Sequence, residues 1–186
     1  KPFKTREGGV MRLENLIREI NEEMLKKITD NRTVSEEEAK KTAQTVGLAA
    51  IKYGDLSNQA SKDYVFDVDR FTSFEGNTGP YILYTIVRIK SILNKYVESG
   101  ASLDGLSICE AGSDFEKALM LETAKFNDMI DTVYEETAPH KICAYIYDTA
   151  NAFNKFYHET KILTEEDEKK RAGYIALLKL TKEVLE

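Results

Sequence analysis

Apolar residues recur every three or four positions along most of this chain, which is the period of an amphipathic helix. Helix-start signals accompany the pattern: Ser35 precedes three glutamates, as an N-cap does in a capping box, and Pro80 can occupy a first helical turn. The pattern predicts helices over residues 10–29, 35–53, 81–97, 113–136, 139–158 and 164–186.

Residues 63–69, with the sequence DYVFDVD, follow a different pattern in which charged and apolar residues alternate at period two. This alternation fits a short strand or an extended segment, and no other stretch shows it convincingly. Helices joined by loops of the observed lengths form bundles. We therefore predict a mainly α fold, a helical bundle with a short extended segment near residues 63–69.

The chain has 186 residues, 42% of them hydrophobic, enough for one substantial core or two small ones. No apolar stretch approaches the roughly 20 residues that cross a bilayer, and no signal-peptide core follows Lys1. We expect a soluble, cytoplasmic protein with no membrane partner. Because the chain opens at Lys1 within a basic, glycine-containing segment, we also expect it to be part of a longer protein.

The formal net charge of −6 argues mildly against a nucleic-acid partner. Phosphate contacts need only a local basic face, however, and two such faces are present. One is the opening segment with Lys1 and Lys4, and the other is the predicted helix that carries Arg88. The two cysteines and two histidines lack metal-ligand spacing, so we expect reduced thiols and no metal site.

Three stretches, in order along the chain, resemble arginyl-tRNA synthetases of class I. The first, KPFKTREGGVMRLENLI, resembles the KMSKS signature loop and the helix that follows it. The second, residues 46–93, includes FEGNTGPY and is the most specific of the three. The third, residues 139–163, resembles the core helix of the anticodon-binding domain.

The resemblance implies that the full-length protein joins L-arginine to arginine tRNA, with ATP and Mg²⁺, through arginyl-adenylate. It further implies that residues 1–74 are the tail of the catalytic domain and residues 75–186 an all-helical anticodon-binding domain. No H-I-G-H-like motif and no parallel βαβ pattern occurs in the sequence. We therefore expect the chain alone to be inactive, with no cofactor bound to it.

Lys1 and Lys4 are the candidate catalytic and ATP-binding residues. In a loop made pliable by two glycines, their ammonium groups can reach a triphosphate, although charge alone fits a solvated basic terminus better. The resemblance aligns both with the lysines of the KMSKS loop. It gives Lys4 the stabilisation of the pyrophosphate leaving group.

Tyr81, Tyr84 and Arg88 are the first candidate RNA-binding residues, because spacings of three and four place them on one helix face. Tyrosine rings stack on unpaired bases, and arginine binds phosphate. Periodicity alone favours core tyrosines instead. The resemblance aligns Tyr84 with a base-contacting tyrosine and adds Tyr157 as a second one, so we expect both rings to face solvent.

Two alternatives stay open at this point. A helical protein–protein interaction domain without an RNA role fits the acidic net charge. The anticodon domain of another class I synthetase, for cysteine or methionine, fits the predicted helices equally well. The FEGNTGPY block favours arginine over those relatives.

Overall fold

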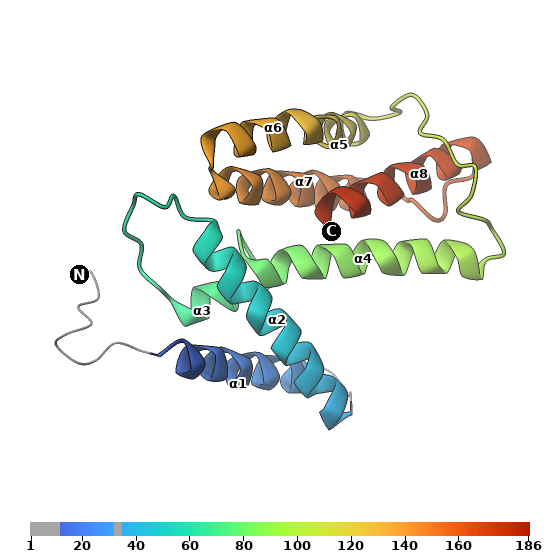
Figure 1. The fold of residues 1–186 in the computed structure, drawn as a ribbon. Helices are drawn as coiled ribbons and strands as arrows, with labels where there is room; N and C mark the ends of the chain where they lie inside the picture. Colours follow the sequence, from blue (N-terminus) through green and yellow to red (C-terminus); the bar gives the residue numbers. More distant parts are fainter. Residues whose placement is uncertain (1–11, 32–34) are drawn as a thin grey trace. The chain divides into compact units, whose positions relative to one another are not determined.

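The computed structural model describes residues 12–31 and 35–186, and in these ranges every regular element is an α-helix (Figure 1). This confirms the predicted mainly α fold. No described helix has the length and apolarity that crossing a membrane requires. The helices are α1 Leu13–Asn31, α2 Glu36–Leu56, α3 Val68–Phe71, α4 Gly79–Glu98, α5 Asp114–Ala124, α6 Phe126–Glu136, α7 Pro139–Glu159 and α8 Glu168–Leu185.

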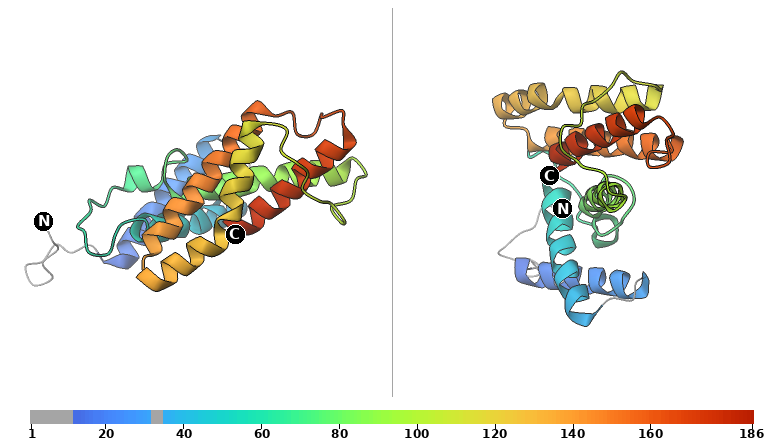
Figure 2. Two further views of the ribbon diagram at one scale, coloured as in Figure 1. Left: turned by 90° about the horizontal axis from the view of Figure 1, so that it is seen from above. Right: turned by 90° about the vertical axis from the view of Figure 1, so that its right-hand side faces the viewer.

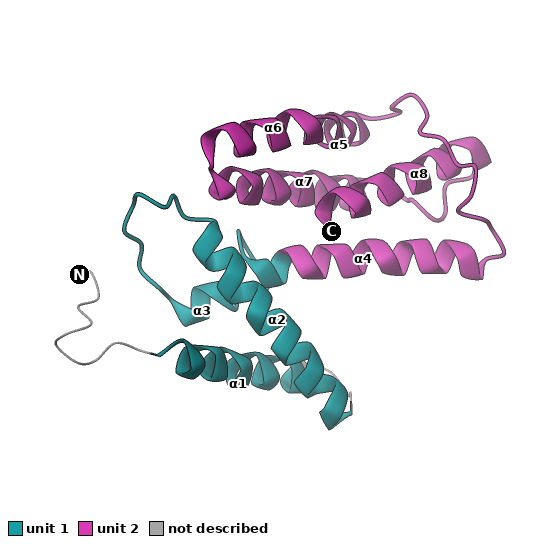
Figure 3. Ribbon diagram, in the orientation of Figure 1, with its two compact units in different colours: residues 1–81 teal, residues 82–186 magenta. Residues whose placement is uncertain are grey.

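The chain forms two compact units, residues 1–81 and 82–186 (Figure 3). The first contains α1, α2, α3 and the start of α4, and the second contains the rest of α4 and α5 to α8. Their boundary falls within the first turn of α4, a few residues after the boundary expected at 74/75.

In the first unit, α1 packs against α2, whose buried positions are mainly alanine and glycine. Ile20 and Met24 of α1 are completely buried. At Gly54 of α2 an added Cβ would lie 2.6 Å from the Phe71 ring, so only glycine admits that ring so close to the helix. Small residues on α2 thus allow its neighbours to approach closely.

The extended segment is shorter than predicted. Residues 63–67 form no helix, but Val68 and Asp69 belong to α3. The Asp67 carboxylate accepts a hydrogen bond from the Arg70 backbone N–H at 3.1 Å and caps that helix. Period-two alternation does not register a cap, so it carried the prediction two residues too far.

In the second unit, α7 packs against α5, α6 and α8 (Figures 1 and 2). Phe153 and Phe156 of α7 are completely buried. The Phe156 ring meets the Tyr174 ring of α8 edge to face, with centroids 5.4 Å apart. The α7 helix is therefore the element around which this unit's core is built.

The helix predicted over residues 113–136 is in fact two helices, which break at Lys125. The Tyr145 hydroxyl of α7 donates a hydrogen bond to the Glu122 carbonyl oxygen at 2.9 Å. In an uninterrupted helix that oxygen would accept from the backbone N–H four residues later. At the break it instead accepts from the Lys125 backbone N–H, three residues on, at 3.2 Å and from the Tyr145 hydroxyl.

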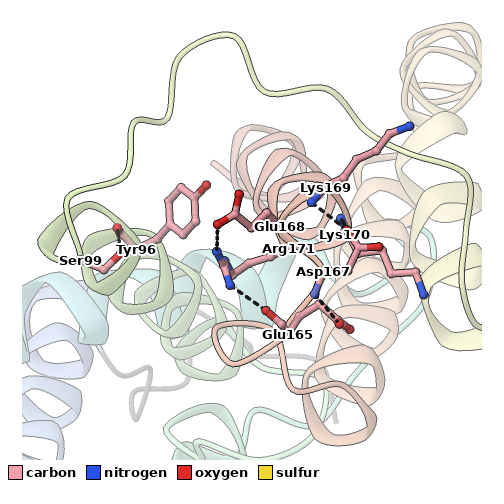
Figure 4. Close-up of polar contacts among 8 residues, drawn as sticks. All are labelled: Tyr96, Ser99, Glu165, Asp167, Glu168, Lys169, Lys170 and Arg171. Atoms are coloured by element: carbon pink, nitrogen blue, oxygen red, sulfur yellow. Dashed lines mark hydrogen bonds and ion pairs between the residues drawn. The ribbon is translucent and has the colours of Figure 1, made fainter.

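The last helix begins at Glu168, four residues later than predicted, because Asp167 caps it. The Asp167 carboxylate accepts from the Lys169 and Lys170 backbone N–H groups at 2.9 and 3.1 Å (Figure 4). The Arg171 guanidinium donates to the Glu165 carbonyl oxygen at 2.7 Å and holds the preceding turn against the helix. Thr164 therefore lies before the helix rather than at its start.

We expect Asp167→Ala to lower the free energy of unfolding by about 1 kcal/mol, because two helix N–H groups lose their acceptor. Urea unfolding followed by circular dichroism measures the change. Asp167→Asn is the matched control, since its amide oxygen still accepts and should retain most of the stability. Equal losses in both variants would show that charge, not capping, is what Asp167 contributes.

Candidate functional site

The α4 and α7 helices each combine a buried stripe with polar and aromatic residues at its edge. On α4, Thr85 and Ile89 are completely buried, whereas Tyr84 is 41% exposed. On α7, Phe153 and Phe156 are buried and Tyr157 is 38% exposed. A hydrogen bond from the Asn154 amide of α7 to the Thr85 hydroxyl of α4 brings the adjacent edges of the two helices together at one site.

Arg88 lies at the centre of this site. Its guanidinium carbon is 4.8 Å from the centroid of the Tyr84 ring and 5.1 Å from that of Tyr157. One guanidinium nitrogen also donates to the Tyr84 hydroxyl at 3.2 Å. The cation thus contacts an aromatic ring from each helix, and we name this group the Tyr84–Arg88–Tyr157 cluster.

Asn154 connects Arg88 to the core. Its side-chain oxygen accepts a hydrogen bond from the Arg88 guanidinium. Its side-chain nitrogen donates to the buried Thr85 hydroxyl at 3.3 Å. Arg88 is therefore held by neutral groups on two helices.

Aromatic neighbours on its own helix support the Tyr157 ring. It stacks on the buried Phe153 ring at a centroid distance of 6.0 Å and an interplanar angle of 28°. The exposed His158 ring lies 5.6 Å from it at a steep angle. Tyr157 is thus fixed on one side by the core and accessible on another.

This arrangement suits single-stranded nucleic acid. Exposed tyrosine rings provide surfaces on which unpaired bases stack, and a fixed guanidinium adds a positive charge that attracts phosphate. Stacking requires exposed rings, and Tyr84 and Tyr157 are both exposed, as expected from the family resemblance and not from periodicity. In the described ranges no cluster of three or more metal-ligating side chains occurs.

The remaining candidates lie elsewhere. Tyr81 is half-buried at the start of α4, in the first compact unit, and its backbone N–H donates to the Thr78 hydroxyl at 3.3 Å. Lys1 and Lys4 lie outside the described residues.

Sequence reasoning assigned no site role to Asn154 or Thr85. The signal available was position: Asn154 precedes Tyr157 by three residues on one helix, so the two share an edge. Its partner Arg88 is 66 residues away in the sequence, and that pairing emerges only when α4 and α7 are placed together.

Two family models match the chain. One, described as the DALR anticodon binding domain, covers residues 82–186, the range that contains the Tyr84–Arg88–Tyr157 cluster. The other, described as the catalytic domain of class I (R) tRNA synthetases, covers residues 1–68.

Curated relatives with similar sequences are named arginine–tRNA ligases. That of Agathobacter rectalis is 64% identical over 194 residues, and that of Alkaliphilus oremlandii is 53% identical over 186 residues. Each match covers 100% of this chain but 32% of the relative, so the chain spans about a third of the length of these relatives.

Solved structures of arginyl-tRNA synthetases have a similar fold. The Thermus thermophilus enzyme matches with a TM-score of 0.82 at 26% identity, over 96% of this chain and 30% of that one. The Plasmodium falciparum enzyme matches with a TM-score of 0.75 at 30% identity, over 95% of this chain and 32% of that one.

Replacing Arg88 tests the cluster without RNA. We expect Arg88→Met to lower the free energy of unfolding by about 1–2 kcal/mol, because two cation–π contacts and their hydrogen bonds disappear. Lys95→Met is the matched control: Lys95 is exposed two helical turns later on α4, and its loss should change stability by less than about 0.5 kcal/mol. Similar small effects in urea unfolding would mean that Arg88 is not held as described.

Proposed function

Because the chain belongs to the family of the DALR anticodon binding domain, we propose that it is the C-terminal part of an arginine–tRNA ligase. In this proposal the full-length protein joins L-arginine to arginine tRNA with ATP and Mg²⁺. Residues 75–186 bind the anticodon loop, and residues 1–74 complete the catalytic domain. The names of the relatives and the two family models support the assignment.

The Tyr84–Arg88–Tyr157 cluster is the observation that carries the RNA-binding part of the proposal. It lies within the range matched by the anticodon binding domain, and both its rings are exposed. A stacked base contributes about 1–3 kcal/mol to binding, so two tyrosines can supply a substantial share of the affinity. Arg88 supplies positive charge for the adjoining phosphates. Tyr81, at the start of the same helix, is a further candidate contact.

The catalytic part of the proposal concerns Lys1 and Lys4. Both precede α1 in the range matched by the class I catalytic domain. A lysine ammonium stabilises the charge that develops on a leaving pyrophosphate, which is the role we assign to Lys4. ATP and Mg²⁺ would be held mainly by residues of the full-length protein beyond this chain.

The alternatives considered from the sequence are weaker. The match of residues 1–68 to the class I (R) catalytic domain favours arginine over cysteine or methionine. The match of residues 82–186 to the DALR anticodon binding domain favours an RNA role over a protein-interaction domain without one.

We expect Tyr84→Ala and Tyr157→Ala in the full-length protein each to weaken binding of arginine tRNA by about 1–3 kcal/mol, the usual effect of losing one stacked base. Tyr84→Phe keeps the ring but loses the hydroxyl that accepts from Arg88, so its effect should be smaller. Filter binding with the transcribed tRNA measures the dissociation constants.

Tyr134→Ala is the matched control for these variants. Tyr134 is 85% exposed on α6 in the same unit but lies outside the cluster, so its removal should leave affinity unchanged. Equal losses for Tyr84→Ala and Tyr84→Phe would instead indicate recognition through the hydroxyl. Unchanged affinity in both alanine variants would refute the assigned site.

Lys4→Ala in the full-length ligase should slow arginyl-adenylate formation by more than about tenfold, equivalent to roughly 1.4 kcal/mol of transition-state stabilisation. The KM for arginine should change little, because the contact forms to pyrophosphate rather than to the amino acid. Pyrophosphate exchange measures both, with Lys26→Ala of α1 as a control lysine. An unchanged rate would move the role to Lys1 or to a lysine elsewhere in the full-length protein.

A further inference from the structure

Asn154 is the polar side chain that joins the Tyr84–Arg88–Tyr157 cluster to the core. We propose that Asn154 is a positioning residue, which fixes the Arg88 guanidinium between the two tyrosine rings by a relay to the buried Thr85 hydroxyl. The inference rests on the proposed RNA-binding function. It adds two residues, Asn154 and Thr85, that act through Arg88 rather than on RNA directly.

Two hydrogen bonds form the relay: Asn154 donates one to Thr85 and accepts the other from Arg88. The Thr85 hydroxyl is completely buried on α4 and accepts from the Asn154 amide at 3.3 Å. This bond turns the amide oxygen toward Arg88, whose guanidinium donates to it. An amide held at its nitrogen leaves its oxygen with one orientation, so the position of the guanidinium follows from that of Thr85.

The guanidinium needs such a constraint because it has several alternatives. An arginine side chain loses much rotamer entropy when it is fixed, and cation–π contacts at partly exposed sites are individually weak. These contacts alone are of the same size as the entropy opposing them. The directional hydrogen bond that Arg88 donates to Asn154 favours the orientation in which both tyrosines contact the cation.

Because Asn154 is neutral, it orients Arg88 without compensating its charge. An aspartate at this position would hold Arg88 more strongly but would compensate its charge. The amide orients the cation and leaves its charge available to a phosphate. The side chain at position 154 therefore sets both where the charge lies and how much of it RNA experiences.

A double-mutant cycle in the full-length protein tests the proposal, with a synthetic anticodon stem–loop of arginine tRNA as the probe. Asn154→Leu should weaken binding roughly tenfold, within the coupling that members of one hydrogen-bond network show. In an Arg88→Met background the same substitution should change affinity by less than about twofold. A loss of equal size in both backgrounds would show a merely structural role and overturn the inference.

Thr85→Val supplies a second variant with a matched control. It removes the hydroxyl at nearly constant volume and should weaken binding only when Arg88 is present. Thr149→Val is the same change at another completely buried helix position, where the hydroxyl donates to the Tyr145 carbonyl of its own helix. Thr149→Val should have one effect in both backgrounds, and identical behaviour of the two threonine variants would also overturn the inference.

The salt dependence of stem–loop binding distinguishes a loss of the Arg88 phosphate contact from misfolding. Asn154→Leu leaves Arg88 charged but no longer fixed beside the phosphate, so the slope of log K against log salt should become shallower by up to roughly 0.7. Asn154→Asp should reduce that slope by roughly 0.7, the value for one phosphate contact to a single strand. An unchanged slope for Asn154→Asp would contradict the contact with Arg88. Failure of the wild-type protein to bind the stem–loop would instead refute the proposed function itself.

Discussion

The burial of Phe153 and Phe156 is the constraint on which the second unit and its candidate site depend. Full burial of a large apolar side chain stabilises a fold by about 1.5–3 kcal/mol, more than a partly exposed cation–π contact contributes. The core therefore decides how α7 is rotated, and the site follows. Successive residues of a helix are about 100° apart around its axis, so Asn154 and Tyr157, each following a buried phenylalanine, lie at the edge of the core.

This coupling explains why an exposed site can be well defined. The Tyr157 ring stacks on Phe153, and the Arg88 guanidinium is linked through Asn154 to Thr85. Tyr157 thus has a completely buried ring directly behind it, and Arg88 is tied to a completely buried hydroxyl through Asn154. Such support reduces the conformational freedom that a binding surface would otherwise lose when its ligand arrives.

Hydrophobic periodicity was sufficient to predict the long helices, because their burial repeats every three or four residues. It failed where a single polar contact from a distant element decides the local structure. At the break the Glu122 oxygen accepts from the Lys125 backbone N–H and from the distant Tyr145 hydroxyl, and nothing in the sequence around residue 125 indicates the second contact. The start of α8 was missed for a local reason: Thr164 and Asp167 are both acceptable caps, and only the path of the chain selects Asp167.

The candidate site, like the fold, could be predicted from the sequence only where its residues are neighbours on one helix. Tyr84 and Arg88 are one turn apart, so the sequence alone placed them on one face of a helix. Tyr157 was added by family resemblance, since its periodicity fits a core residue equally well. The link from Arg88 to Asn154 could not be predicted, because it requires the relative placement of two helices whose residues are 66 positions apart.

A chain with a net charge of −6 can still present a positive site, because among the residues that the structure describes Arg88 contacts only neutral groups whereas many lysines are paired. Several lysines are paired with nearby carboxylates: Lys40 with Glu36 at 2.6 Å, Lys90 with Glu186 at 2.6 Å, and Lys125 with Glu122 at 2.7 Å. The hydrogen bond from Lys90 lowers the pKa of Glu186, as expected for a pair in which both groups are charged.

Arg88 is bound differently. Within residues 12–31 and 35–186, its guanidinium contacts an amide, a phenol hydroxyl and two aromatic rings, all of them neutral. At physiological ionic strength, charges more than about 8 Å apart are largely screened, so the net charge of the chain counts less at the cluster than the groups beside it. The local charge that a phosphate meets at the cluster is therefore that of Arg88, and the total charge of the chain is a poor guide to its partner.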